Sequence, residues 1–163
     1  MDEHAVRVAT PQELGRLRGV EEASEALFAD IGIGPFAPSD EDHLLGATVV
    51  LVTGEPPVGF ASVGIVDGAA HIWQLSVLPA SGRHGRGTAL VEAACGWARR
   101  RGLRSVTLTT FRDVAWNGPF YARLGFEVVD ELPPGLAAIR RDEQVKGDDA
   151  FGARVAMRRI LVS

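Results

Sequence analysis

The residues best suited to chemistry lie in one glycine- and arginine-rich turn, Arg83-His84-Gly85-Arg86-Gly87. Residues 71–77 before the turn favour a strand, which Pro79 ends because proline lacks a backbone N–H. Apolar residues recur at helical spacing from residue 90 to residue 98, so a helix begins just after the turn. The N–H groups at the start of a helix attract anions, and glycines let a ligand approach the backbone closely. The turn therefore predicts a phosphate-binding site.

Two common phosphate-binding loops are excluded. The stretch has no lysine of the Walker type, and Leu90 stands where a dinucleotide fingerprint needs its third glycine. It resembles instead the acyl-coenzyme A loop of the GNAT superfamily of N-acetyltransferases, whose pattern is Gln/Arg-x-x-Gly-x-Gly/Ala after a strand that ends in Val-x-Pro. Residues 84–89 fit this pattern after residues 77–79, with His84 in place of Gln or Arg. The loop alone leaves open a simple strand-to-helix turn with surface arginines.

A second stretch, Asn117-Gly-Pro-Phe-Tyr-Ala-Arg-Leu-Gly-Phe126, resembles the second motif of the same family. The two motifs follow each other in the family's order, with a predicted helix and strand between them. Two loose motifs in register are more specific than either one alone. Residues 47–130 carry the resemblance, and the N-terminal strand and helix extend it.

The resemblance implies an α+β, or mixed α/β, fold in one domain that spans residues 1–163. Its central sheet is mostly antiparallel, is splayed between the fourth and fifth strands, and has helices on both faces. The sequence pattern agrees, because three strands joined by short turns precede the helix after the glycine-rich turn. Residues 134–146 predict an inserted helix. We expect strands at residues 5–9, 47–53, 58–66, 71–77, 105–110, from 126 and at 154–162, and other helices at 11–30, 39–45, 87–101 and from 117.

By resemblance, acetyl-CoA is the co-substrate. Its pantetheine arm would insert where the sheet splays, and the Val77 N–H would stabilise the developing oxyanion. Asn117 has an alternative role as the cap of the helix that follows it. The residues that the resemblance assigns to cofactor binding are Leu75, Val77, Arg83, His84, Gly85, Arg86, Gly87, Thr88, Ala89 and Asn117.

Tyr121 stands at the family's acid position, where a protonated phenol would donate to the leaving thiolate. Its alternative role is an aromatic core residue. If Phe120 packs into the core, we expect Tyr121 to face the cleft. For the proton of the amine, His71 is a candidate base, although a lone histidine on a strand is commonly a packing residue. Glu25 and Asp30 are further candidates, and a water relay is the default.

An acceptor pocket is predicted beside the first long helix. Its candidate lining residues are Phe28, Asp30, Ile31 and Trp73, and the open alternative is that the apolar ones pack the helix onto the sheet. Residues 1–40 are acidic and residues 83–104 are rich in arginine, which suits a cationic acceptor and an anionic cofactor.

Composition excludes several other classes. The formal net charge of −4 argues against a general nucleic-acid binder, and no apolar run is long enough to span a membrane. The single cysteine, Cys95, excludes an internal disulfide, and the four histidines lack the spacing of a metal site. With no signal peptide, these features suggest the cytoplasm.

The sequence therefore predicts an acetyl-CoA-dependent N-acetyltransferase that acts on a primary amine of a small molecule, by direct attack in a ternary complex. A protein or peptide N-acetyltransferase is the alternative enzyme. An acyl-CoA-binding sensor without turnover and a phosphate-binding structural domain are alternatives from other classes. A homodimer is compatible with the sequence.

Overall fold

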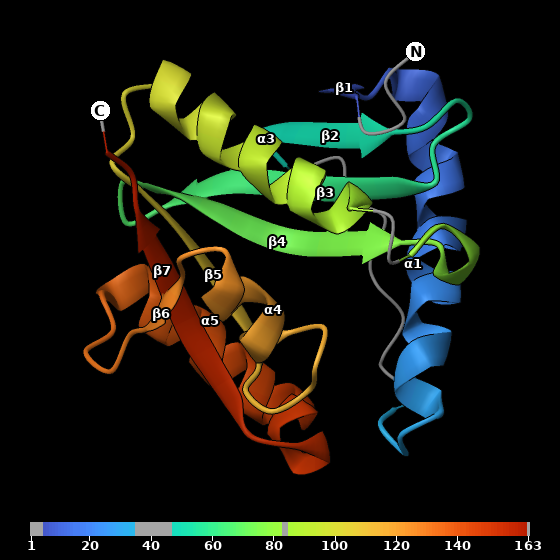
Figure 1. The fold of residues 1–163 in the computed structure, drawn as a ribbon. Helices are drawn as coiled ribbons and strands as arrows, with labels where there is room; N and C mark the ends of the chain where they lie inside the picture. The colour runs from blue at the N-terminus through green and yellow to red at the C-terminus, as the bar shows by residue number, and fades with distance from the viewer. Residues whose placement is uncertain (1–4, 35–46, 83–84, 163) are drawn as a thin grey trace.

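The computed structural model describes residues 5–34, 47–82 and 85–162, which form one seven-stranded sheet in the order β1-β2-β3-β4-β5-β7-β6 (Figure 1). Neighbouring strands are antiparallel except β4 and β5, which are parallel. The predicted α+β class and mostly antiparallel sheet are therefore confirmed. The strands are β1 (Val6–Val8), β2 (Val49–Thr53), β3 (Gly59–Val66), β4 (Ala69–Val77), β5 (Ser105–Phe111), β6 (Glu127–Val128) and β7 (Arg154–Ile160).

Helices cover both faces of this sheet. None of the described helices combines the length and apolar content needed to cross a membrane. The predicted helix at residues 39–45 lies outside the described residues, as do Arg83 and His84. The helices are α1 (Leu14–Ala29), α3 (Arg86–Arg100), α4 (Gly118–Arg123) and α5 (Pro134–Lys146), with short 3-10 turns at η1 (Pro11–Glu13), η2 (Pro79–Ser81) and η3 (Asp148–Phe151).

Alternation along the strands divides the core into two layers. On one face, α3 crosses β2, β3 and β4, and Leu90 and Val91 pack against Leu51 and Ala61 (Figure 1). On the other face, the α1 residues Leu17 and Val20 belong to a separate cluster with Val50, Val52 and Phe60. The strands β2 and β3 thus present alternate residues to α3 and to α1.

The sheet opens between β4 and β5. These strands pair only at Ala70↔Val106 and His71↔Thr107, whereas β4 continues to Val77 and β5 to Phe111. Figure 1 shows the two strands diverging past this point. The predicted splay is therefore confirmed, and we call the space between the diverging strands the β4–β5 gap.

A β-bulge bends β4 just past its last pair with β5. Ser62 pairs with Gln74 and Val63 pairs with Ile72, so Trp73 is the extra residue of the bulge. A bulge of this kind increases the local bend of a strand. It directs the second half of β4 along β3 and away from β5.

The helix α5 is an insertion between β6 and β7, with the bounds that the sequence predicted. Its N-terminus is capped from a distant turn, because the Asp67 carboxylate accepts hydrogen bonds from the N–H groups of Gly135 at 2.8 Å and Leu136 at 2.9 Å. Carboxylates stabilise helix N-termini in this way. The cap fixes one end of α5 to the β3–β4 hairpin.

Candidate active site

The N-terminus of α3 has the geometry of an anion site. Gly85 precedes the helix with φ +80°, a left-handed conformation that favours glycine. The Gly85 carbonyl accepts a hydrogen bond from the Ala89 N–H at 3.0 Å. The N–H groups of Arg86, Gly87 and Thr88 come before this first intrahelical bond and are the groups that an anion can accept from.

Two residues of this turn also have structural contacts. A Cβ added at Gly87 would lie 3.4 Å from Cζ of Phe120, so the glycine lets α4 approach the first turn of α3. The Arg86 guanidinium donates to Thr53 Oγ1 at 3.1 Å, at the end of β2. The side chain of Arg86 thereby fixes the helix start to the sheet, while its backbone N–H belongs to the anion site.

The β4 wall of the gap carries Leu75 and Val77, which are partly buried and pack against the core under α3. Beyond His71, the edge of β4 that faces β5 has no strand partner in the described part of the chain. Backbone groups on an unpaired strand edge are ready to bond an extended ligand. The free edge leads through η2 toward the N-terminus of α3, so the gap and the anion site are continuous along the chain.

Tyr121 lies in the core beneath the start of α3. Its ring contacts the rings of Phe120 and Phe126, with centroids 5.1 Å and 5.7 Å away, and only 6% of the residue is exposed. Burial raises the pKa of the phenol above its usual value, so the group stays protonated. Phe120 packs against the same core cluster and lies over Gly87, and it is the less buried of the two aromatic residues.

Asn117 immediately precedes α4. Its carbonyl accepts the Tyr121 N–H at 2.9 Å, and its side-chain amide donates to the Trp116 carbonyl at 3.2 Å. The side chain makes no capping hydrogen bond to α4. The alternative role that the sequence suggested for this side chain is therefore not the one the structure shows.

His71 lies where β4 and β5 separate, at the closed end of the β4–β5 gap. It is 1% exposed, and its Nδ1 is 2.8 Å from Thr107 Oγ1, across the last pair of β4 and β5. The Trp73 ring packs edge-on at 4.6 Å. Burial lowers the pKa of His71 to about 4, against the opposing charges of Glu143 and Asp67, so the imidazole is neutral near pH 7. This environment favours the packing role over that of a base.

Glu25 on α1 has a pKa that suits a base for the amine proton better than that of His71 does. Burial, together with the negative charges of Glu21 and Glu22, raises its pKa to about 7. Glu25 precedes Phe28 by about one helical turn on α1. Its carboxylate can therefore exchange protons near neutral pH, whereas Asp30 is exposed at the end of the same helix.

The predicted acceptor residues do not all come together. Phe28 packs against Phe111 at the end of β5 and against Trp116 before α4, with ring centroids 5.8 Å and 5.4 Å apart. Ile31 is 52% exposed just past α1, and Trp73 is 39% exposed on β4. Sequence reasoning missed Phe111 and Trp116, although Trp116 immediately precedes the second motif.

The described residues contain no group of three or more His, Cys, Asp or Glu side chains that could hold a metal ion. Cys95 is buried in α3, and burial raises the pKa of its thiol. The site therefore combines an anion-binding helix start, an open strand edge, a protonated phenol and a carboxylate that titrates near pH 7.

Comparison with known proteins gives a family match and a fold match. The sequence pattern of the acetyltransferase (GNAT) family matches residues 14–126. The structure of PaiA N-acetyltransferase from Thermoplasma acidophilum, in complex with coenzyme A, aligns with a TM-score of 0.72 and 17% identity, covering 96% of this chain and 98% of that one.

Two further structures share the fold. N-acetylglutamate synthase from Neisseria gonorrhoeae, complexed with coenzyme A and N-acetyl-glutamate, aligns with a TM-score of 0.73 and 19% identity over 98% of this chain and 35% of that chain. The ribosomal-protein-S18-alanine N-acetyltransferase from Escherichia coli aligns with a TM-score of 0.70 and 17% identity over 98% of this chain and 94% of that chain.

Proposed function

Because the chain belongs to the acetyltransferase (GNAT) family, we propose that it transfers an acetyl group from acetyl-CoA to a primary amine of a small molecule. The family match confirms the resemblance that the two sequence motifs predicted. The observation that carries the proposal is the opening of the sheet between β4 and β5, next to the start of α3. An extended thioester with an anionic end fits an open strand edge that leads to a helix N-terminus.

The cofactor supplies an activated acetyl thioester. In our proposal the N–H groups of Arg86, Gly87 and Thr88 bind its pyrophosphate, and the free edge of β4 at Leu75 and Val77 pairs with the pantetheine arm. The Asn117 amide contacts the same arm, and Ala89, Arg83 and His84 complete the predicted set. The coenzyme A complex of the Thermoplasma acidophilum relative supports this assignment.

The reaction needs one proton removed from the amine and one delivered to the leaving sulfur. Tyr121 remains protonated because burial raises its pKa, so it is the proposed proton donor. The Val77 N–H stabilises negative charge on the thioester oxygen. We assign Glu25 to the end of a water relay that accepts the amine proton, since its pKa of about 7 suits a base at neutral pH.

The fold is compatible with several acceptors, because the relatives include an N-acetylglutamate synthase and a ribosomal-protein-S18-alanine N-acetyltransferase. The carboxylates of Glu21, Glu22 and Glu25 on α1 support a small cationic amine as the acceptor. The proposed lining residues are Phe28, Asp30, Ile31 and Trp73. A protein or peptide acceptor and a sensor without turnover are the alternatives. We also propose that the chain forms a single domain and acts in the cytoplasm. A homodimer is compatible with this proposal.

Thiol release from acetyl-CoA, measured against a panel of amines, polyamines, amino acids and peptides, tests this function. We expect turnover with one or more small primary amines. Turnover with peptides alone would replace the small-molecule acceptor with a protein. Calorimetric binding of coenzyme A without turnover on any amine would identify a sensor, and absence of binding would refute the proposal.

A further inference from the structure

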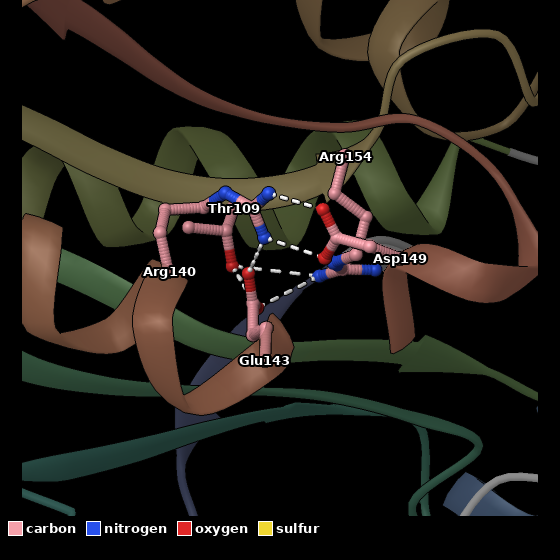
Figure 2. Close-up of polar contacts among 5 residues, drawn as sticks. All are labelled: Thr109, Arg140, Glu143, Asp149 and Arg154. Carbon is pink, nitrogen blue, oxygen red and sulfur yellow. Dashed lines mark hydrogen bonds and ion pairs between the residues drawn. The ribbon is translucent and has the colours of Figure 1, made fainter. Parts of the chain in front are cut away.

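A polar cluster packs against β5 just beyond the point where β5 leaves β4. We define the α5 cluster as Thr109 of β5, Arg140 and Glu143 of α5, Asp149 of η3 and Arg154 of β7, and Figure 2 shows their side chains converging. Thr109 follows Thr107 by two residues and so faces the same side of the strand. The cluster therefore lies on the β5 side of the gap, on the face that α5 covers.

Glu143 is the centre of this cluster. Its carboxylate accepts hydrogen bonds from Thr109 Oγ1 at 2.6 Å, Arg140 Nη1 at 2.7 Å and Arg154 Nη2 at 3.0 Å. Burial acts to raise the pKa of Glu143, but the charge of Arg154 and the hydrogen bonds to the carboxylate outweigh it, and the pKa is lowered. Glu143 thus stays ionised and holds three groups from three elements.

Arg140 and Arg154 extend the cluster in two directions. Arg140 is 9% exposed and makes two further hydrogen bonds to Asp149, at 3.0 Å and 2.6 Å. The Arg154 guanidinium lies over the Phe111 ring, with Cζ 4.5 Å from its centroid. Two arginines and two carboxylates balance in charge, and together they join β5 to α5, η3 and β7.

β5 pairs along its whole length with β7, so these two strands can shift toward β4 only together. Past His71 and Thr107, the facing edges of β4 and β5 have no strand partner in the described residues. Unpaired edges of neighbouring strands gain hydrogen bonds when they close on each other. The bulge at Trp73 restrains β4, and the hydrogen bond from Thr109 to Glu143 restrains β5.

We propose that the α5 cluster holds the β5 wall of the β4–β5 gap in place, so that the gap is open before the cofactor arm enters. The inference rests on the proposed function of this gap. Thr109 and Glu143 are then positioning residues, which act on the cofactor through the backbone of β5. If the gap is open only part of the time, the apparent affinity for the cofactor falls by that fraction.

Calorimetric titration with coenzyme A tests this inference. Thr109→Val keeps the shape of the side chain and deletes the hydroxyl, and Glu143→Gln removes the charge at the centre of the cluster. We expect each to weaken coenzyme A binding by about tenfold, with kcat at saturating acetyl-CoA within about twofold of wild type. Thr109→Ser retains the hydroxyl, and we expect it to restore wild-type affinity.

Glu13→Gln is the matched control, because Glu13 accepts two hydrogen bonds from Arg7 at the opposite end of the sheet. It should lower thermal stability without changing coenzyme A binding. Wild-type affinity in both Thr109→Val and Glu143→Gln would overturn the inference and leave the proposed function intact. Equal weakening in Thr109→Ser and Thr109→Val would overturn it as well. Absence of binding by the wild type would overturn both the proposed function and the inference.

Discussion

At the scale of single residues, removing the Tyr121 hydroxyl tests the proposed general acid. Tyr121→Phe keeps the ring that packs against Phe120 and Phe126 and removes only the proton donor. We expect kcat to fall by about 10²-fold, with coenzyme A affinity unchanged. The hydroxyl makes no hydrogen bond with a described residue, so the free energy of unfolding should change by less than about 1 kcal/mol. A wild-type kcat under conditions where chemistry limits the rate would exclude Tyr121 as the acid.

Glu25 and His71 predict opposite dependences of stability on pH. The pKa of Glu25 is raised from 4.5 to about 7, so the folded state binds more protons than the unfolded state and stability falls as pH rises through this range. The pKa of His71 is lowered from 6.5 to about 4, so stability falls as pH drops from 6.5 toward 4. The two effects partly offset each other in the wild type.

Single substitutions separate these two effects. In Glu25→Gln, stability should still fall as the pH drops, because His71 is unchanged. In His71→Asn, stability should still fall as the pH rises, because Glu25 is unchanged. Melting temperatures measured between about pH 4 and pH 8 check both expectations. Glu25→Gln should also remove the limb of kcat/KM that rises near pH 7. Unchanged pH profiles in Glu25→Gln would exclude this carboxylate as the proton acceptor.

Single residues also mark the limit of what the sequence could predict. The motif around Tyr121 identified the residue, but its burial depends on Phe120 packing over Gly87, a contact between segments far apart in the chain. The burial of His71 likewise depends on Thr107, which belongs to a strand that only the fold brings close. Local patterns name such residues, whereas their environment comes from long-range packing.

At the scale of elements, the start of α3 is the part of the site that local chemistry determines. Gly85 has φ +80° at this end of the helix, and Gly102 has φ +73° just past the other end. Alanine at either position is strained by about 1 kcal/mol. Gly85→Ala and Gly102→Ala should therefore lose similar stability.

Only one of these two changes should affect the cofactor. We expect Gly85→Ala to weaken coenzyme A binding by about tenfold, because the strain is relieved by shifting the N–H groups that follow it. Gly102→Ala should bind as the wild type does, since a Cβ there meets open space away from the cleft. Chemical denaturation and calorimetry measure the two effects. Equal affinity in both variants would remove the anion site from the start of α3.

The elements were predicted well where the pattern is local. The strand, glycine-rich turn and helix around residues 71–101 and the inserted helix at 134–146 follow from periodicity and from turn residues. The cap that Asp67 provides to α5 and the cluster around Glu143 were not predictable in the same way. Asp67 lies 68 residues before Gly135 and Thr109 lies 34 residues before Glu143, and no local motif pairs residues so far apart.

At the scale of the whole molecule, the sheet consists of two halves that meet at β4 and β5. The strands β1 to β4 form one half, and β5, β7 and β6 form the other. The halves are joined across the sheet at His71–Thr107, by the Asp67 cap of α5 at one end of the gap, and by Phe28 against Phe111 and Trp116 at the other. In our proposal, both the cofactor and the acceptor bind between these two halves.

Hydrogen–deuterium exchange with and without coenzyme A tests this claim most directly. Within the described residues, the edge of β4 at residues 74–77 that faces β5 has no strand partner, and the first N–H groups of α3 come before its first intrahelical hydrogen bond, from Ala89 to Gly85. We predict that coenzyme A slows exchange at both segments and leaves exchange in β1 and β2 unchanged. Exchange that is unchanged at both segments, or slowed only elsewhere in the sheet, would contradict it.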